Sequence, residues 1–170
     1  MKISSVGLKL AAIAFAVVLA GCETKPPPAA PTPPPPAPVV TPAPSIVPGS
    51  AEDLRVNVGD TVHFDYDKSA VLDADKATLQ RQAAWLAKFP AIKVTVEGYC
   101  DERGTREYNI ALGARRANAV KEYLVSLGVS AGRVDTISYG KERPICTESN
   151  EACWAQNRRG VTIIASGANS

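Results

Sequence analysis

The chain has little of what a nucleic-acid-binding protein needs. Only 6% of its 170 residues are aromatic, and its formal net charge is only +2. Without the two lysines of its N-terminal leader, 17 basic residues face 17 acidic ones. Nucleic acid requires a basic face, and stacking on bases requires aromatic side chains. The composition therefore argues against nucleic acid as a partner.

The apolar run near the N-terminus is too short to span a bilayer. It covers residues 10–20, follows Lys2 and Lys9, and ends in Leu19-Ala20-Gly21-Cys22. Eleven apolar residues suit the core of a signal peptide rather than a transmembrane helix. We therefore predict a signal peptide over residues 1–21. It is either a lipoprotein signal or an ordinary secretory signal with a chance cysteine after it.

The small residues before Cys22 resemble a bacterial lipobox. That resemblance implies lipid on the Cys22 thiol, cleavage before it and acylation of the new amine. Two or three acyl chains anchor a protein far more firmly than one. In the lipoprotein class that the lipobox resembles, an aspartate after the cysteine favours inner-membrane retention. Glu23 stands there instead, which implies an outer-membrane anchor with the folded domain facing the periplasm.

Proline dominates the next segment. Between Pro26 and Pro48, 12 of 23 residues are proline, so no hydrophobic core can form. Such a segment adopts polyproline II and acts as a semi-rigid spacer, and residues 23–50 would reach on the order of 80 Å. Residues 22–50 are therefore predicted to be a lipidated cysteine followed by a tether.

Three cysteines remain after the anchor, and they form no zinc motif. Their spacings are wrong, and His63 is the only histidine. Cys146 and Cys153 flank a polar hexapeptide in a predicted oxidising compartment. A bridge there would close a short loop and stabilise the fold by roughly 2–3 kcal/mol. We predict that disulfide, a free and buried Cys100, and no metal or cofactor.

Residues 51–170 have the length of one domain with a single core. Strands alternate with helices, which predicts a two-layer α/β sandwich: a mixed four-stranded sheet with two main helices on one face. In the longer second helix, Ala117, Val120, Leu124 and Leu127 are expected to face the core. Asn157-Arg158-Arg159 is expected to be a solvated turn with a structural pair. The strands are expected at 62–66, 92–99, 134–139 and 161–165, and the helices at 73–88, at 106 to just before Gly128, and as one turn near Trp154.

Polar residues gather where the second strand meets the second helix. Asp101 follows the strand, and Arg116 lies one turn before Val120 on the inward stripe of the helix. Helical side chains lean toward the N-terminus, so Arg116 should reach back toward the loop of Asp101. Asn109 shares that helix face. These residues predict a polar pocket, although an internal Asp101–Arg116 salt bridge remains an alternative.

The same residues resemble the OmpA-like family of peptidoglycan-binding domains. The family's helix signature matches Asn109, Leu112, Arg116-Ala117, Val120 and Leu124, with Gly113 where the family has serine. Asp101-Glu102-Arg103-Gly104-Thr105 and Phe64-Asp65-Tyr66-Asp67 are similar to its lipoprotein branch. The resemblance covers about residues 60–165 and implies a βαβαβ core.

That resemblance implies a ligand and a set of site residues. The ligand is the diaminopimelate residue of the peptidoglycan stem peptide, with Asp101 receiving its amine and Arg116 a carboxylate. Asn109 and Leu112 match pocket positions, Tyr66 and Asp67 the pocket edge, and Arg103 the rim. It also implies Tol proteins as partners, chiefly the periplasmic TolB, and a role in envelope integrity and cell division.

The sequence leaves two other classes of function open. No nucleophile has a recognisable base beside it, so we expect a non-enzymatic tether. A cell-wall hydrolase, or a lipoprotein cofactor of one, is the first alternative. A periplasmic assembly scaffold that binds proteins without binding the wall is the second.

Overall fold

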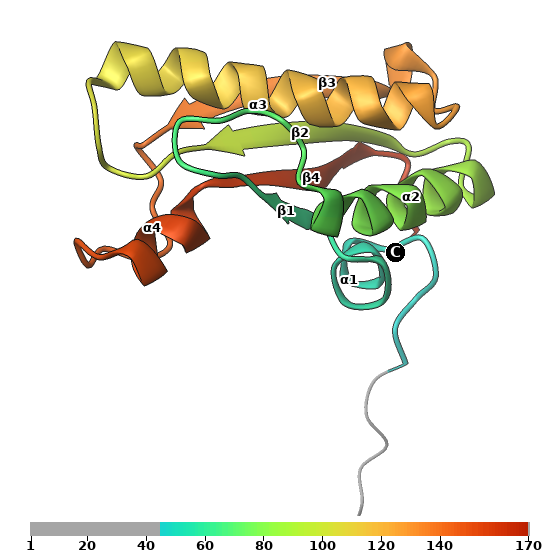
Figure 1. Ribbon diagram of the computed structural model, residues 1–170. Coiled ribbons are helices and arrows are strands. Elements are labelled where there is room, and N and C mark those ends of the chain that lie inside the picture. The colour runs from blue at the N-terminus through green and yellow to red at the C-terminus, as the bar shows by residue number, and fades with distance from the viewer. Residues whose placement is uncertain (1–44, 170) are drawn as a thin grey trace, which may run out of the picture. The chain divides into compact units, whose positions relative to one another are not determined.

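The computed structural model describes residues 45–169 (Figure 1). The predicted signal peptide, Cys22 and the proline-rich segment up to residue 44 lie outside these residues. Among the described residues, no helix combines the length and the apolar character needed to cross a membrane. The elements in chain order are α1 (Ala51–Asp53), the π-helical turn η1 (Leu54–Val58), β1 (Thr61–His63), α2 (Asp73–Lys88), β2 (Lys93–Tyr99), α3 (Arg106–Ser126), the 3₁₀ turn η2 (Ala131–Arg133), β3 (Val134–Gly140), α4 (Glu151–Asn157) and β4 (Arg159–Ser166).

The four strands form one mixed sheet in the order β1-β4-β2-β3. β2 and β3 are parallel, and α3 makes the crossover that a parallel pair requires. β4, the last strand, inserts between β1 and β2 and is antiparallel to both. Helices α2 and α3 lie side by side on one face of this sheet (Figure 1). The predicted two-layer α/β fold is confirmed.

The core fills the space between the sheet and its two helices. Val94 and Val96 of β2 point into it, and Val120 and Leu124 of α3 meet them there. Full burial of such a side chain stabilises the fold by about 1.5–3 kcal/mol. Leu127, which was expected on the same stripe, is 38% exposed. That expectation was wrong because α3 ends at Ser126, and Val129 packs against the core in its place.

The sequence caps α3 at both ends. The Thr105 side chain accepts a hydrogen bond from the Tyr108 amide and so begins the helix beside the end of β2. Gly128, at φ +97°, provides the left-handed residue that ends it. These two signals set where α3 begins and where it ends.

Two glycines let α3 lie unusually close to β2. A Cβ atom on Gly98 would stand 1.9 Å from the carbonyl oxygen of Gly113. A Cβ on Gly113 would stand 2.3 Å from the Ser138 hydroxyl of β3. The departure of Gly113 from the family's serine therefore fits the close contact of this helix with the sheet.

The chain joins the domain at the end of the sheet where β2 begins. There the buried Asp53 carboxylate accepts hydrogen bonds from the Gly49 amide, the Asn57 side chain and the Trp85 indole. The Asn169 amide donates to the Gly49 carbonyl, which places the C-terminus at the same end (Figure 1). The polar pocket lies at the other end of the sheet, where β2 ends.

Two sequence expectations near that pocket were wrong. β1 stops at His63 rather than residue 66, because the chain turns at Asp65–Lys68, with Asp67 at φ 56°. Asn157-Arg158-Arg159 is not a solvated turn, since these side chains are only 3–7% exposed. Asn157 bonds the backbone of Cys146, Arg158 bonds the Phe64 carbonyl, and Arg159 begins the central strand β4.

Candidate functional site

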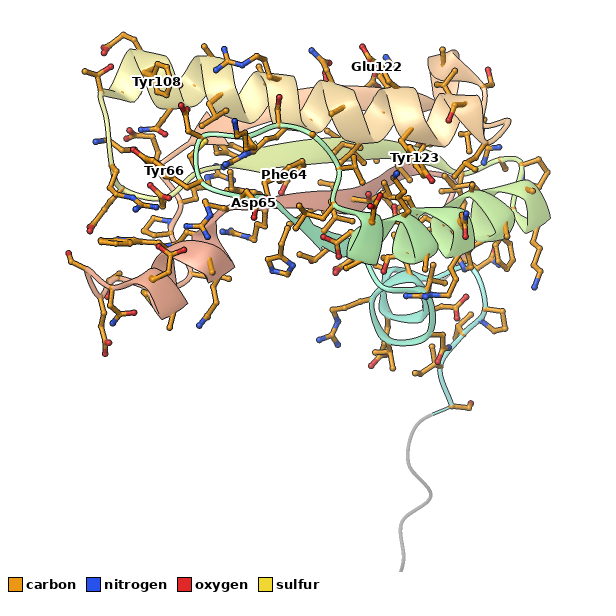
Figure 2. The ribbon with its side chains drawn as sticks, in the orientation of Figure 1. Phe64, Asp65, Tyr66, Tyr108, Glu122 and Tyr123 are labelled. Carbon is orange, nitrogen blue, oxygen red and sulfur yellow. A yellow bond between two sulfur atoms is a disulfide. The ribbon has the colours of Figure 1, made fainter. Side chains whose placement is uncertain are left out.

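A pocket of about 270 Å³ opens where β2 ends and α3 begins. The loop after β1 closes its other side. Figure 2 shows Tyr66 of that loop and Tyr108 of α3 at this end of the domain. The lining residues are Tyr66, Asp67, Cys100, Asp101, Arg103, Gly104, Tyr108, Asn109, Leu112 and Arg116. All seven residues that the sequence placed in the binding site therefore line one cavity.

Arg116 forms the floor of the pocket and is fully buried. Its guanidinium donates to three carbonyl oxygens: Tyr99 and Lys68, both at 2.8 Å, and Asp65 at 3.1 Å. Among residues 45–169 no carboxylate lies within salt-bridge distance of it. Burial lowers the pKa of Arg116 from its usual value, but a guanidinium remains charged in proteins. The floor therefore carries a buried positive charge that three carbonyl dipoles and the charge of Asp101 stabilise without a direct ion pair.

Asp101 is buried in the same pocket, 4% exposed. Two arginines hold its carboxylate: Arg103 reaches Oδ2 at 2.6 Å, and Arg158 reaches it at 3.5 Å. Burial raises the pKa of Asp101, but the hydrogen bonds and charge of Arg103, with help from Arg158, outweigh it, so the net pKa is below the usual value. Asp101 is thus a carboxylate at neutral pH. The internal Asp101–Arg116 salt bridge is absent from the ion pairs of the described residues.

Asn109 and Leu112 project from the first turns of α3. The Asn109 amide donates to the carbonyls of Arg103 at 2.8 Å and Thr105 at 3.0 Å. It therefore fixes the loop that carries Asp101. Leu112 is 5% exposed and supplies an apolar wall. Cys100 is free and buried, its thiol donates to the Asn109 carbonyl, and burial raises its pKa.

The pocket mouth is made of exposed side chains. Tyr66 is 58% and Tyr108 46% exposed, and the Tyr108 hydroxyl donates to the Asp67 carboxylate. This contact joins the loop after β1 to α3 across the opening. Arg103 lies at the rim, with its guanidinium carbon 4.0 Å from the ring centre of Tyr66 and 4.0 Å from that of Trp154.

Sequence reasoning missed the contribution of α4 and its neighbours. Arg158 donates to the Phe64 carbonyl at 2.9 Å and to Glu151 at 2.6 Å as well as contacting Asp101. Trp154 donates to Glu102 at 2.9 Å. The available signal was the pair Arg158-Arg159 at the start of the apolar strand β4. Arginines in that position become buried and therefore need polar partners. The Cys146–Cys153 disulfide lies just before and within α4.

The pocket lining includes a buried carboxylate, Asp101, and a buried guanidinium, Arg116, that do not pair with each other. Such a pocket is complementary to a ligand that carries both an ammonium and a carboxylate, and charge-assisted hydrogen bonds are roughly twice as strong as neutral ones. Within residues 45–169, no group of three or more His, Cys, Asp or Glu side chains could hold a metal ion.

The two-layer fold and the charged pocket at the end of its sheet place this domain in the class of small ligand-binding domains. Comparison with known proteins identifies its family. The model of the OmpA family matches residues 63–158. A peptidoglycan-associated lipoprotein of Rhizobium meliloti is 55% identical over 128 residues, which are 75% of this chain and 72% of the relative. Another, from Agrobacterium fabrum, is 48% identical over 155 residues, 90% of this chain and 85% of the relative.

Solved structures agree with this match. The crystal structure of the peptidoglycan-associated lipoprotein from Burkholderia pseudomallei is 43% identical, with a TM-score of 0.61, and the match covers 62% of this chain and 89% of that one. The periplasmic domain of Helicobacter pylori MotB, 21% identical with a TM-score of 0.56, shares the fold. The chain belongs to the OmpA family, in its group of peptidoglycan-associated lipoproteins.

Proposed function

We propose that this protein is an outer-membrane lipoprotein that binds peptidoglycan non-covalently and so ties the membrane to the cell wall. The ligand is the diaminopimelate residue of an uncrosslinked stem peptide. One observation carries the proposal: Asp101 and Arg116 line the same pocket without pairing with each other. A buried cation without a carboxylate partner favours a ligand that brings one.

Each lining residue has a role in this proposal. The two N–H groups of Arg116 that are not used on carbonyls bind a ligand carboxylate, since a guanidinium has five donors and three are already engaged. Asp101 accepts from the ligand ammonium, which replaces part of the contact with Arg103. Backbone amides near Tyr66 and Asp67 bind a second carboxylate. Asn109 and Leu112 shape the wall.

The position of the pocket supports a tethering role. The chain joins the domain beside the start of β2, whereas the pocket lies beyond its end. A lipid anchor and a spacer before residue 45 would therefore be attached to the folded domain at the end of the sheet away from the pocket.

A role with the Tol system is part of the same proposal. The chief partner is TolB, and the surface we assign to it is the exposed pocket rim with Tyr66 and Tyr108. Both partners would need that rim. Added muropeptide should therefore lower the amount of TolB retained on the immobilised protein.

Sedimentation with purified sacculi tests the proposal. The chain should sediment with them, free diaminopimelate should release it, and no muropeptide should appear in the supernatant. Arg116→Ala should stay in solution, whereas Arg115→Ala, an exposed neighbour on α3 outside the pocket lining, should sediment like the wild type. Released muropeptides would favour a hydrolase, and binding of periplasmic proteins without sedimentation would favour a scaffold.

A further inference from the structure

Helix α4 holds the two arginines that contact Asp101. Glu151, in its first turn, accepts from Arg158 at 2.6 Å with one oxygen, and its other oxygen lies 3.8 Å from Arg103. Trp154 covers the Arg103 guanidinium at 4.0 Å. Arg103 and Arg158 both form ion pairs with the Asp101 carboxylate. The orientation of Asp101 therefore depends on α4, a helix that does not line the pocket.

This helix is too short to be stable by itself. It has seven residues, and isolated helices shorter than about 12–15 residues are marginal in water. Two devices fix its beginning: the Asn150 side chain accepts from the Cys153 amide at 2.9 Å, and the disulfide joins Cys153 to Cys146. At its end, the Asn157 side chain bonds the backbone of Cys146 in both directions, as acceptor and as donor.

We propose that α4 is a positioning element for ligand binding and that the Cys146–Cys153 disulfide makes it redox-sensitive. The inference rests on the proposed function, because it concerns the affinity of that same pocket. With the disulfide closed, Glu151 and Trp154 hold Arg103 and Arg158 against Asp101. With the disulfide open, the loop from 146 to 153 is released and α4 frays, so Asp101 loses its fixed orientation and the ligand ammonium binds more weakly.

The redox step needs a dithiol reductant. A thiolate of the reductant attacks Sγ of Cys146, which is more exposed than the buried Cys153. A mixed disulfide between the reductant and Cys146 forms as the Cys146–Cys153 bond breaks, and the released Cys153 thiolate takes up a proton. The second thiol of the reductant, as its thiolate, then attacks the reductant's own sulfur in the mixed disulfide. This releases the Cys146 thiolate, which takes up the second proton. Two electrons and two protons reach the protein, and the reductant becomes a cyclic disulfide.

The two tryptophans allow the element to be observed separately from the rest of the fold. The Trp154 indole donates to Glu102 beside the pocket, and the Trp85 indole donates to Asp53 at the far end of the sheet. In a ¹H–¹⁵N spectrum of the soluble mature chain, dithiothreitol should move the Trp154 indole resonance and leave that of Trp85 in place. Trp85 is thus an internal control for global unfolding.

Calorimetry with a purified diaminopimelate-containing muropeptide tests the effect on binding. Reduction should weaken binding about tenfold, which corresponds to about 1.4 kcal/mol. Glu151→Gln keeps the disulfide and should weaken binding about threefold, because it removes the charge shared by the two arginines. Glu52→Gln, an exposed glutamate at the far end, should bind like the wild type.

The outcomes separate the two proposals. If the reduced chain and Glu151→Gln both bind within about twofold of the oxidised wild type, α4 has no positioning role, whatever the Trp154 resonance does. A lower melting temperature with unchanged affinity would also overturn the positioning role, since it reveals a structural role only. If the oxidised wild type itself does not bind the muropeptide, the proposed function fails, and this inference fails with it.

Discussion

The guanidinium of Arg116 donates to the carbonyl of Tyr99 at 2.8 Å, at the last residue of β2, and forms no ion pair with Asp101. The same group contacts the carbonyls of Asp65 and Lys68. Arg116 therefore ties the end of a central strand to the loop after β1. Arg116 thus holds the walls of the pocket together and also supplies the positive charge at its floor.

Arg116→Lys should destabilise the fold even though it conserves the charge. An ammonium is a compact donor on a flexible stem and cannot reach three carbonyls with the geometry of a guanidinium. We expect a loss of about 2–3 kcal/mol in the free energy of unfolding, because buried acceptors lose their donors. Urea denaturation followed by circular dichroism measures it, with Arg115→Lys as the matched exposed control. Equal stability of the two variants would contradict the role of those three bonds.

Asp101→Asn should weaken muropeptide binding by about 2–5 kcal/mol, the range for losing one partner of a buried charge pair. The amide keeps the size of the side chain but no longer attracts an ammonium. Calorimetry gives the affinity, and a native circular dichroism spectrum checks the fold. Wild-type affinity in a folded Asp101→Asn chain would place the ligand amine elsewhere.

Gly113→Ala should be destabilising by about 1–3 kcal/mol, the usual range for overpacking. The added methyl would lie 2.3 Å from the Ser138 hydroxyl and 2.9 Å from the Gly98 carbonyl oxygen. The backbone of β2 cannot yield there without moving the pocket. Gly132→Ala is the control, since nothing lies within 4 Å of its added Cβ. Thermal unfolding should separate the two variants clearly.

The free energy of unfolding should fall at acidic pH, because two buried carboxylates, Asp53 and Asp101, become protonated. The Trp85 indole foremost, then Asn57 and the Gly49 amide, lower the pKa of Asp53, and that of Asp101 is also below its usual value. A folded pKa below the unfolded one favours folding at every pH above the unfolded value, about 3.9. That contribution disappears as the pH falls through the lower, folded pKa values.

The melting temperature should therefore change little from pH 7 to about 5 and drop steeply below about 4. Asp53→Asn should begin with a lower melting temperature at pH 7 and lose less of it on acidification. A wild-type profile that is flat down to pH 3 would show that neither carboxylate gains from folding.

The sequence alone determined much of this protein, because its signals are local. Period-two and helical spacing defined the strands and helices, and Thr105 and Gly128 defined the ends of α3. The helical lean of Arg116 predicted that it would reach back toward the loop of Asp101, and its guanidinium bonds the Tyr99 carbonyl just before that loop. Short-range chemistry also predicted the Cys146–Cys153 bridge that the structure contains.

Only the tertiary structure decided what pairs with what. Arg158 is 57 residues from Asp101 in sequence, and it reaches the pocket because β4 inserts beside β1 and β2. Whether Arg116 would pair with Asp101 or bond carbonyls depended on which backbone ends that topology brought together. Spacing along a chain fixes which face a side chain occupies, whereas a buried charge takes its partners from segments that meet only after folding.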